Sequence, residues 1–155
     1  MLDYDVLEEV ETEETKTEEV PTLNHSFTCV RILRQLLADD SIEALPELSL
    51  AIGNGLTPDI SVYQKERIQP NFLEDVTRVE VPPMLAIEVV SPSQDIQDLL
   101  HKAKTFVQSG INTAWTVEPF TRTIFVTTKN GTKLFHDTTV ESAGVTVDFN
   151  KIFNG

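Results

Sequence analysis

The sequence contains little cysteine, few basic residues and no long apolar run, and each shortage excludes a class of protein. Its single cysteine, Cys29, excludes an internal disulfide and suits a reducing compartment. No apolar stretch approaches the roughly 18 residues that a membrane span requires. The first twenty residues are acidic rather than basic, which argues against a secretory signal peptide. We therefore expect a cytoplasmic protein without a membrane partner.

Basic residues are outnumbered by acidic ones, since 12 Lys and Arg face 25 Asp and Glu and the net charge is −13. Residues 1–20 hold nine of the acids and one lysine, a charge of −8, which leaves −5 for residues 21–155. An acidic surface repels a phosphate backbone, so the charge disfavours a nucleic-acid partner without excluding one. We interpret residues 1–20 as an acidic flexible tail; the alternative is an arm that covers a site or meets a partner.

An apolar run from Met84 to Ser91, bounded by prolines, predicts a strand buried on both faces. Both faces are apolar apart from Glu88, which alternation puts on the side opposite Leu85, Ile87 and Val89. A lone charge in such a place costs several kcal/mol unless it is paired or bound to a cation. Glu88 is therefore a candidate functional residue.

Two segments have the three-and-four spacing of amphipathic helices. The first is expected over residues 24–39, with Asn24 as its N-cap. Its apolar stripe consists of Phe27, Val30, Leu33 and Leu37, widened by Cys29, Ile32 and Leu36. The second is expected to begin after Asp95, as N-cap, and to end at Gly110.

Short alternating runs predict further strands. They are residues 47–52, 59–63, 114–117, 123–128 and 132–135, with 145–149 as an edge strand or short tail. Gly53-Asn54-Gly55 and Asn130-Gly131 are hairpin signals. Residues 64–83 are expected to form a long loop. The chain has room for one domain, which we expect over residues 21–155.

Asp59 and Lys102 are the partners that the pattern offers to Glu88. Asp59 begins an apolar strand, and Lys102 lies at the edge of the buried face of the second helix. Two carboxylates on adjacent strands repel each other unless a divalent cation lies between them. A hydrated Mg²⁺ needs only one or two carboxylates, and it can activate water against a phosphodiester. A satisfied structural carboxylate pair is the equal alternative for the two acids. For Lys102 the alternative is a surface ion pair with Asp98, four residues earlier on the same helix.

The histidines and the cysteine carry a weaker signal. His25 falls in the first turn of the first helix, where it is either a surface residue or a residue that faces a site at the end of the sheet. Neither Cys29 nor His136 has metal-ligand spacing around it, and we interpret both as structural.

Several motifs, taken in order, resemble the Uma2 family of endonucleases, which is abundant in cyanobacteria and assigned to the PD-(D/E)xK nuclease superfamily. The resemblance covers roughly residues 24–128 and includes the position of His25 at the start of a helix. The matching residues are Pro58-Asp59, Ala86 to Ser93, Asp98, Lys102, Phe106, Gly110, Trp115 and Glu118-Pro119.

The resemblance implies an α/β fold with a restriction-endonuclease-like core, in which helices flank a mixed central sheet. It also implies a Mg²⁺-dependent endonuclease that hydrolyses DNA, with a homodimer as one option. Asp59 and Glu88 would hold Mg²⁺ or Mn²⁺ with the carbonyl of Val89. Lys102 would complete the catalytic residues, because Val90 stands where the superfamily usually has its lysine. His25 and Asp98 would be accessory residues.

The sequence also departs from the family pattern. Phe106 and Ala114 stand where the family usually has tyrosines, Glu118 stands where it has aspartate, and its N-terminal hairpin has no match here. The rival interpretation is a catalytically inactive nuclease-fold module with a regulatory or protein-binding role. A nuclease that acts on RNA or on branched DNA is a third alternative.

Overall fold

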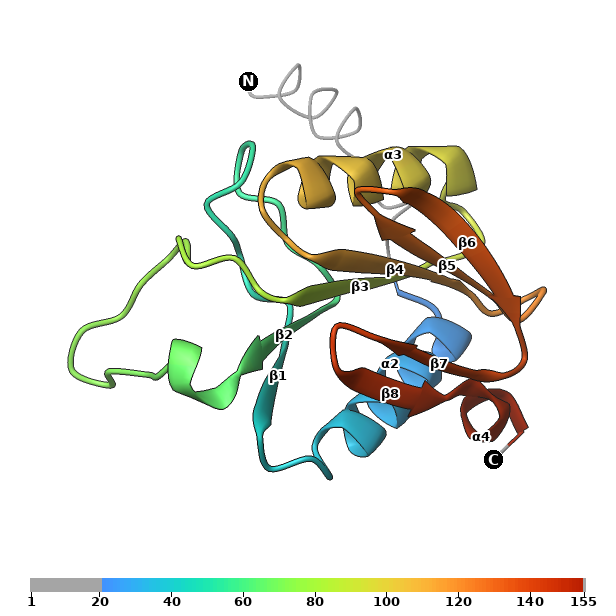
Figure 1. Ribbon diagram of the computed structural model, residues 1–155, viewed down its shortest axis with the longest axis horizontal. Coiled ribbons are helices and arrows are strands. Elements are labelled where there is room, and N and C mark those ends of the chain that lie inside the picture. Colours follow the sequence, from blue (N-terminus) through green and yellow to red (C-terminus); the bar gives the residue numbers. More distant parts are fainter. Residues whose placement is uncertain (1–20, 155) are drawn as a thin grey trace, which may run out of the picture.

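The computed structural model describes residues 21–154, and a six-stranded mixed sheet forms its centre (Figure 1). The strands lie in chain order, and every neighbouring pair is antiparallel except β3 and β4. They are β1 (Ile42–Pro46), β2 (Ile60–Gln64), β3 (Leu85–Val89), β4 (Thr113–Glu118), β5 (Thr123–Thr128) and β6 (Gly131–His136). The mixed α/β sheet expected from the sequence is confirmed. The acidic tail expected at residues 1–20 lies outside the described residues.

Helices and a small second sheet cover the two faces of the main sheet (Figure 1). Helix α3 (Ile96–Gln108) lies across one face and joins β3 to β4, the crossover that a parallel pair needs. Helix α2 (Leu23–Leu36), the small sheet and α4 (Phe149–Asn154) cover the other face. The small sheet pairs β7 (Thr139–Ser142) with β8 (Val145–Asp148). Within residues 21–154, no helix has the length and apolar character needed to span a membrane.

Strand β3 is the buried strand that the sequence predicts, and its two faces belong to different cores. All of its residues are buried. Leu85, Ile87 and Val89 pack in the larger core with residues of α2, β4 and the small sheet. Ala86 packs in a smaller core with residues of α3. Glu88 alternates with Ala86, so β3 turns this carboxylate toward α3.

Most other predicted elements are confirmed. Helix α3 has Asp95 as its N-cap, and the Asp95 carboxylate accepts a hydrogen bond from the Gln97 N–H over 2.9 Å. Strands β2, β4, β5 and β6 begin and end within one residue of the predicted positions. The long loop follows β2, with the short 3-10 helix η2 (Lys65–Arg67) at its start.

The strand predicted at residues 47–52 is wrong, and the first strand lies earlier, at β1. Residues 47–59 form an irregular connection, and the backbone leaves the extended region at Glu47, where φ is 49°. Pro46 ends β1, which is an edge strand and therefore tolerates a residue without an N–H. Gly53-Asn54-Gly55 lies within this connection and does not form a hairpin between two strands.

Helix α2 forms close to where it is predicted, but its cap and its buried face differ. Thr22, not Asn24, is the N-cap, and its hydroxyl accepts a hydrogen bond from the His25 N–H over 3.3 Å. The helix ends at Leu36 rather than near residue 39. The buried residues are Thr28, Ile32 and Leu36. The predicted stripe is about half exposed at Phe27, Val30 and Leu37. The predicted stripe is therefore too wide; the core contacts are made, as expected, by Cys29, Ile32, Leu33 and Leu36.

The C-terminal segment builds the second sheet and a final helix. The strand predicted at residues 145–149 is found as β8, but it pairs with β7 and not with an edge of the main sheet, and Phe149 begins α4. Trp115 of β4 holds this segment in place, because its ring meets Phe149 edge to face and its Nε1 donates to Ser142 Oγ over 2.7 Å. The larger core is thereby closed on the α2 side of the sheet.

Candidate active site

The buried carboxylate of Glu88 meets the ammonium of Lys102 beneath α3. Glu88 is 7% exposed in β3, and the Lys102 Nζ lies 2.5 Å from Glu88 Oε2. The same Nζ lies 5.8 Å from the centre of the Phe106 ring, one turn further along α3. The lysine stem therefore lies along the core while its charge reaches the acid. Of the two interpretations of Lys102, the surface pair with Asp98 is not the arrangement found in residues 21–154.

Strand pairing brings Asp59 to the same place. Ile60 of β2 lies opposite Ile87 of β3, and continuing this antiparallel register by one residue puts Asp59 opposite Glu88. Asp59 Oδ2 accepts a hydrogen bond from the Val89 N–H over 2.7 Å. Two carboxylates thus stand side by side at the carboxyl end of β3, one of them buried and one partly buried.

His25 faces Asp59 rather than solvent. Its Nε2 lies 3.1 Å from Asp59 Oδ2, and its side chain is 11% exposed. The hydrogen bond to Asp59 raises the pKa of His25 above its ordinary value, against the lowering effect of burial. The ring thereby holds a proton toward the carboxylate and restrains its orientation.

Asp98 is the predicted site residue that lies apart from the others. It is exposed in the first turn of α3, where its N–H donates to the Asp95 carbonyl over 3.1 Å. An acid at this position suits the start of a helix. The remaining predicted residues come together from α2, the start of β2, β3 and α3. They are His25, Asp59, Glu88, Val89 and Lys102.

Glu88 has a strongly raised pKa in this site. Burial, followed by the charge of Asp59, raises the pKa of Glu88 to about 8, against the opposing effect of Lys102. A divalent cation beside the two carboxylates would oppose this rise, because a positive charge favours the ionised form of Glu88. The site therefore has the electrostatic character of a cation site.

Three polar atoms on the α3 face of the sheet lack hydrogen-bond partners within residues 21–154: Ser61 Oγ, Glu88 Oε2 and Thr116 Oγ1. Strand pairing brings the three residues close together, because Ser61 lies opposite Ala86 and Thr116 lies opposite Glu88. The contact of Lys102 with Oε2 is an ion pair without the alignment of a hydrogen bond. Buried polar atoms normally have partners. This group of oxygens fits a hydrated cation, whose bound waters would satisfy them.

The raised pKa of Glu88 predicts how the Glu88→Gln substitution changes stability with pH. The folded pKa of about 8 exceeds the ordinary value of 4.5, so the wild-type protein loses stability as the pH rises from about 4.5 to about 8, and the loss is nearly complete above 8. Glutamine carries no charge. We therefore expect the two proteins to melt together at pH 5, and the variant to melt at least about 4 °C higher at pH 8.5. Scanning calorimetry in EDTA measures this difference, and a variant that melts lower at pH 8.5 would contradict it.

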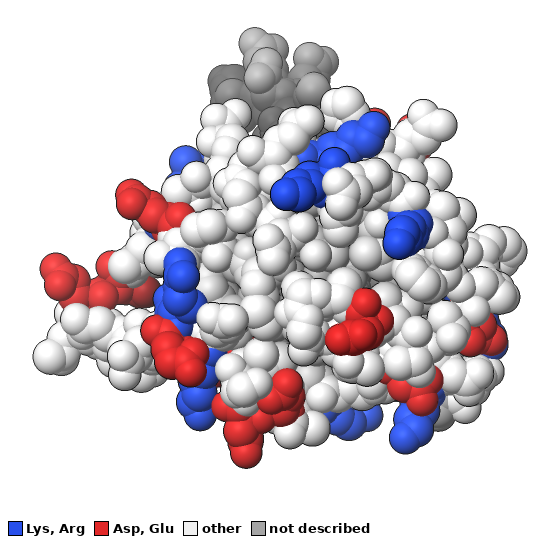
Figure 2. All heavy atoms as spheres, viewed as in Figure 1, with Lys and Arg blue, Asp and Glu red and all other residues white. Residues whose placement is uncertain are grey.

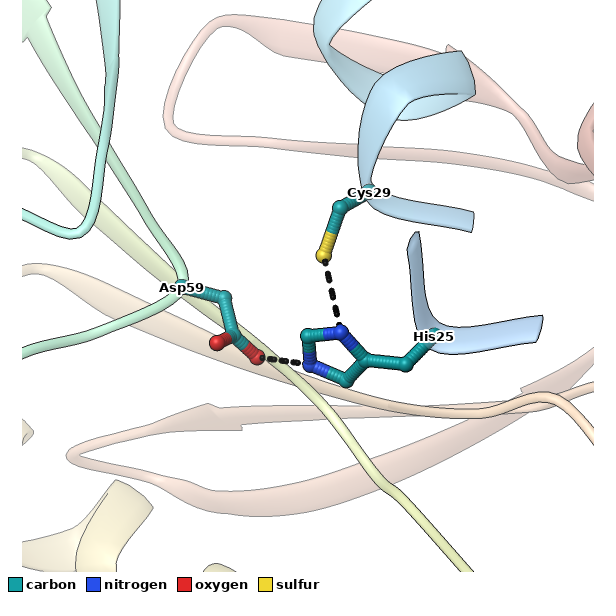
Figure 3. Close-up of side chains that lie close together, drawn as sticks. All are labelled: His25, Cys29 and Asp59. Carbon is teal, nitrogen blue, oxygen red and sulfur yellow. Dashed lines mark hydrogen bonds and ion pairs between the residues drawn. The ribbon is translucent and has the colours of Figure 1, made fainter. Parts of the chain in front are cut away.

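Cys29 is the residue at this site that the sequence interpretation missed. Its Sγ lies 3.9 Å from His25 Nδ1, and His25, Cys29 and Asp59 each offer a ligand atom within 4.8 Å of the others. Figure 3 shows the imidazole between the sulfur and the carboxylate. The spacing of four between His25 and Cys29 on a helix is the signal that could have found this pair, since such residues lie on one face.

Comparison with known proteins identifies the family and the fold of the chain. The family model of Uma2, described as "Putative restriction endonuclease", matches residues 11–155, which extends the match beyond residues 24–128 at both ends. The chain is similar in structure to a "putative nuclease belonging to DUF820" from Anabaena variabilis ATCC 29413, with a TM-score of 0.71 and 22% identity. That alignment covers 86% of this chain and 82% of the other. No curated protein matches the chain. Because the family model spans nearly the whole sequence, this chain belongs to the Uma2 family.

Proposed function

We propose that this protein is a Mg²⁺- or Mn²⁺-dependent endonuclease that hydrolyses DNA phosphodiester bonds. The observation that carries the proposal is the convergence of Asp59, Glu88 and Lys102 from three separate elements at the carboxyl end of β3. Two carboxylates can hold a divalent cation, and an ammonium beside them can stabilise charge during a metal-assisted attack on a phosphodiester. Membership of the Uma2 family supports the same chemistry.

Asp59 and Glu88 would hold the cation, with the carbonyl of Val89 as a further oxygen ligand. The donor set consists of hard oxygens, which Mg²⁺ and Mn²⁺ prefer. The Ser61 and Thr116 hydroxyls, which lack hydrogen-bond partners within residues 21–154, and the raised pKa of Glu88 both favour a cation at this place. When bound, the ion would lower the pKa of a coordinated water and stabilise negative charge on the phosphate.

Lys102 would act on the reacting phosphate. Its ammonium already lies against Glu88, and its side chain is 27% exposed, so part of it remains open to a ligand. A positive charge fixed beside the scissile bond stabilises the charge that develops in the transition state or orients the attacking water. The Phe106 ring, whose centre lies 5.8 Å from the Lys102 Nζ, helps to hold this charge in place.

His25 would be a positioning residue, because it contacts Asp59 and not the reacting atoms. We expect His25→Ala to lower Mn²⁺ affinity and cleavage rate by about 10- to 100-fold, the usual effect of losing a group that orients a metal ligand. Calorimetric titration with Mn²⁺ measures the affinity. The exposed His101 on α3 gives the control variant His101→Ala. Loss of cleavage with unchanged Mn²⁺ affinity in His25→Ala would contradict the positioning role.

The surface charge bears on how DNA would be held. Acidic and basic side chains are interspersed on the face shown in Figure 2, and the whole chain carries −13. Such a surface supplies little general attraction for a phosphate backbone. Binding would therefore depend on local contacts at the cation and Lys102. The test is cleavage of supercoiled plasmid DNA with Mg²⁺, with Mn²⁺ and with EDTA, beside single-stranded RNA and a branched DNA duplex as the alternative substrates.

A second candidate is a nuclease-fold module without activity that binds another protein. The net charge of −13 favours it, because that charge opposes DNA binding. Calorimetry separates the two functions. The nuclease requires the intact protein to bind Mg²⁺ or Mn²⁺ with a dependence on Asp59 and Glu88, whereas no binding of either ion would favour the module.

A further inference from the structure

A cluster of three different metal-ligating side chains adjoins the paired carboxylates. His25 and Cys29 lie one turn apart on α2, and Asp59 lies at the start of β2. The His25 Nε2 is 3.1 Å from Asp59 Oδ2, and the Cys29 Sγ is 3.9 Å from His25 Nδ1. Ligand atoms of all three residues lie within 4.8 Å of one another, and Figure 3 shows the imidazole ring between the Cys29 sulfur and the Asp59 carboxylate.

The spacing of these atoms suits a tetrahedral metal ion. Zinc bonds of roughly 2.0–2.3 Å to nitrogen, oxygen and sulfur put two ligands of one ion about 3.5 Å apart. The two short contacts use different ring nitrogens, since Nε2 lies 3.1 Å from Asp59 Oδ2 and Nδ1 lies 3.9 Å from Cys29 Sγ. One ion would bind only one of these nitrogens, and a small rotation of the His25 side chain would bring it between the other two ligands. The widest separation, up to 4.8 Å, needs a side-chain movement of about 1 Å to close. Three protein ligands would leave a fourth position for water.

The chemistry of the cluster differs from that of the Asp59–Glu88 pair. A thiolate and an imidazole select Zn²⁺ or Co²⁺, whereas Mg²⁺ prefers oxygen ligands alone. Burial, together with Asp59, Glu88 and Glu47, raises the pKa of Cys29 to about 12. The free protein therefore keeps a neutral thiol, and a bound cation would displace its proton to solvent. The same acidic groups that hold the proton favour a cation in its place.

We infer that His25, Cys29 and Asp59 form a second metal site, for a thiophilic divalent cation such as Zn²⁺. Asp59 is common to this site and to the carboxylate pair, so one carboxylate would have to serve both ions. Occupancy by Zn²⁺ would therefore withdraw Asp59 from the Mg²⁺ site and inhibit cleavage. This regulatory consequence rests on the proposed nuclease function, whereas the metal site itself does not.

Absorption spectroscopy with Co²⁺ tests the site on the full chain, without any assay of activity. Cobalt bound to a thiolate gives a charge-transfer band in the near ultraviolet, and Cys29 is the single cysteine of the chain. We expect the band to appear with one equivalent of Co²⁺, to be absent in Cys29→Ala, and to require at least tenfold more Co²⁺ in His25→Ala. The exposed His136 gives the control His136→Ala, which should titrate like the wild type. Circular dichroism verifies that each variant is folded.

A wild-type protein without the band at saturating Co²⁺ would overturn the site, as would an equal Co²⁺ requirement of His25→Ala and the wild type. Protection of the Cys29 thiol from a disulfide reagent by Zn²⁺ gives a second readout that needs no variant; a thiol that reacts equally fast with and without Zn²⁺ would also overturn it. Zn²⁺ inhibition is then measured with each protein normalised to its own Mg²⁺-dependent cleavage. If no protein cleaves DNA, the cobalt spectra still decide the metal site.

Discussion

Replacing Glu88 with glutamine is expected to lower Mg²⁺-dependent DNA cleavage by at least about a thousandfold, because a bound cation contributes several kcal/mol of charge stabilisation to the transition state. Glutamine keeps the size of the side chain and removes the charge that would hold the ion. Glu88 is 7% exposed, so bulk water would not replace the lost carboxylate as a ligand in a fixed position. The rate of plasmid nicking over a range of Mg²⁺ concentrations measures the loss.

The matched variants make this prediction specific. Asp59→Asn should cause a loss of similar size, because register and charge pair Asp59 with Glu88. Glu141→Gln, on the exposed side of β7, removes a carboxylate far from this pairing and should cleave like the wild type. Equal cleavage by Glu88→Gln and the wild type would show that another site, or another protein in the preparation, cuts the DNA.

Replacing Lys102 with alanine is expected to lower cleavage by about 10²- to 10³-fold, the cost of removing one group that stabilises charge in a transition state. Metal affinity should respond in the opposite way. The Lys102 ammonium lies 2.5 Å from Glu88 Oε2 and competes with a cation for that oxygen. Without it, Mn²⁺ should bind Lys102→Ala at least as tightly as it binds the wild type.

Lys104 supplies the control for this second prediction. It is exposed on the same helix, so Lys104→Ala removes an equal charge from α3 without touching the site. Cleavage rates and calorimetric Mn²⁺ affinities of the two variants separate a catalytic role from a general loss of positive charge. If Lys102→Ala cleaves DNA at the wild-type rate, the role assigned to Lys102 is wrong. It is also wrong if Lys104→Ala loses as much of the cleavage rate as Lys102→Ala does.

The carboxylate pair could be predicted because its signals are local. A charged residue in a short apolar run bounded by prolines has few interpretations, and alternation alone gives the face on which Glu88 lies. Asp59, directly after Pro58, is predicted to begin a strand, and β2 begins at the next residue, Ile60. Helical periodicity gave the position of Lys102 at the edge of a buried face, and the resemblance to Uma2 proteins gave it a role that spacing could not.

The parts that were missed depend on contacts between distant residues. β1 ends in Pro46, which argues against a strand until the edge position of β1 is known. The buried face of α2 is selected by its packing against β1, β3 and β8, and the predicted apolar stripe is wider than that face. Cys29 belongs to a cluster only because α2 sets His25 beside Asp59, at the start of a strand 34 residues further along the chain.

The most direct test of the central claim is the anomalous scattering of Mn²⁺ in crystals of the wild-type protein. We expect one strong peak between the carboxylates of Asp59 and Glu88, roughly 2 Å from an oxygen of each, and its loss in crystals of Glu88→Gln. Crystals saturated with Mn²⁺ that show no peak between these two residues, or a peak that remains in Glu88→Gln, would contradict the account.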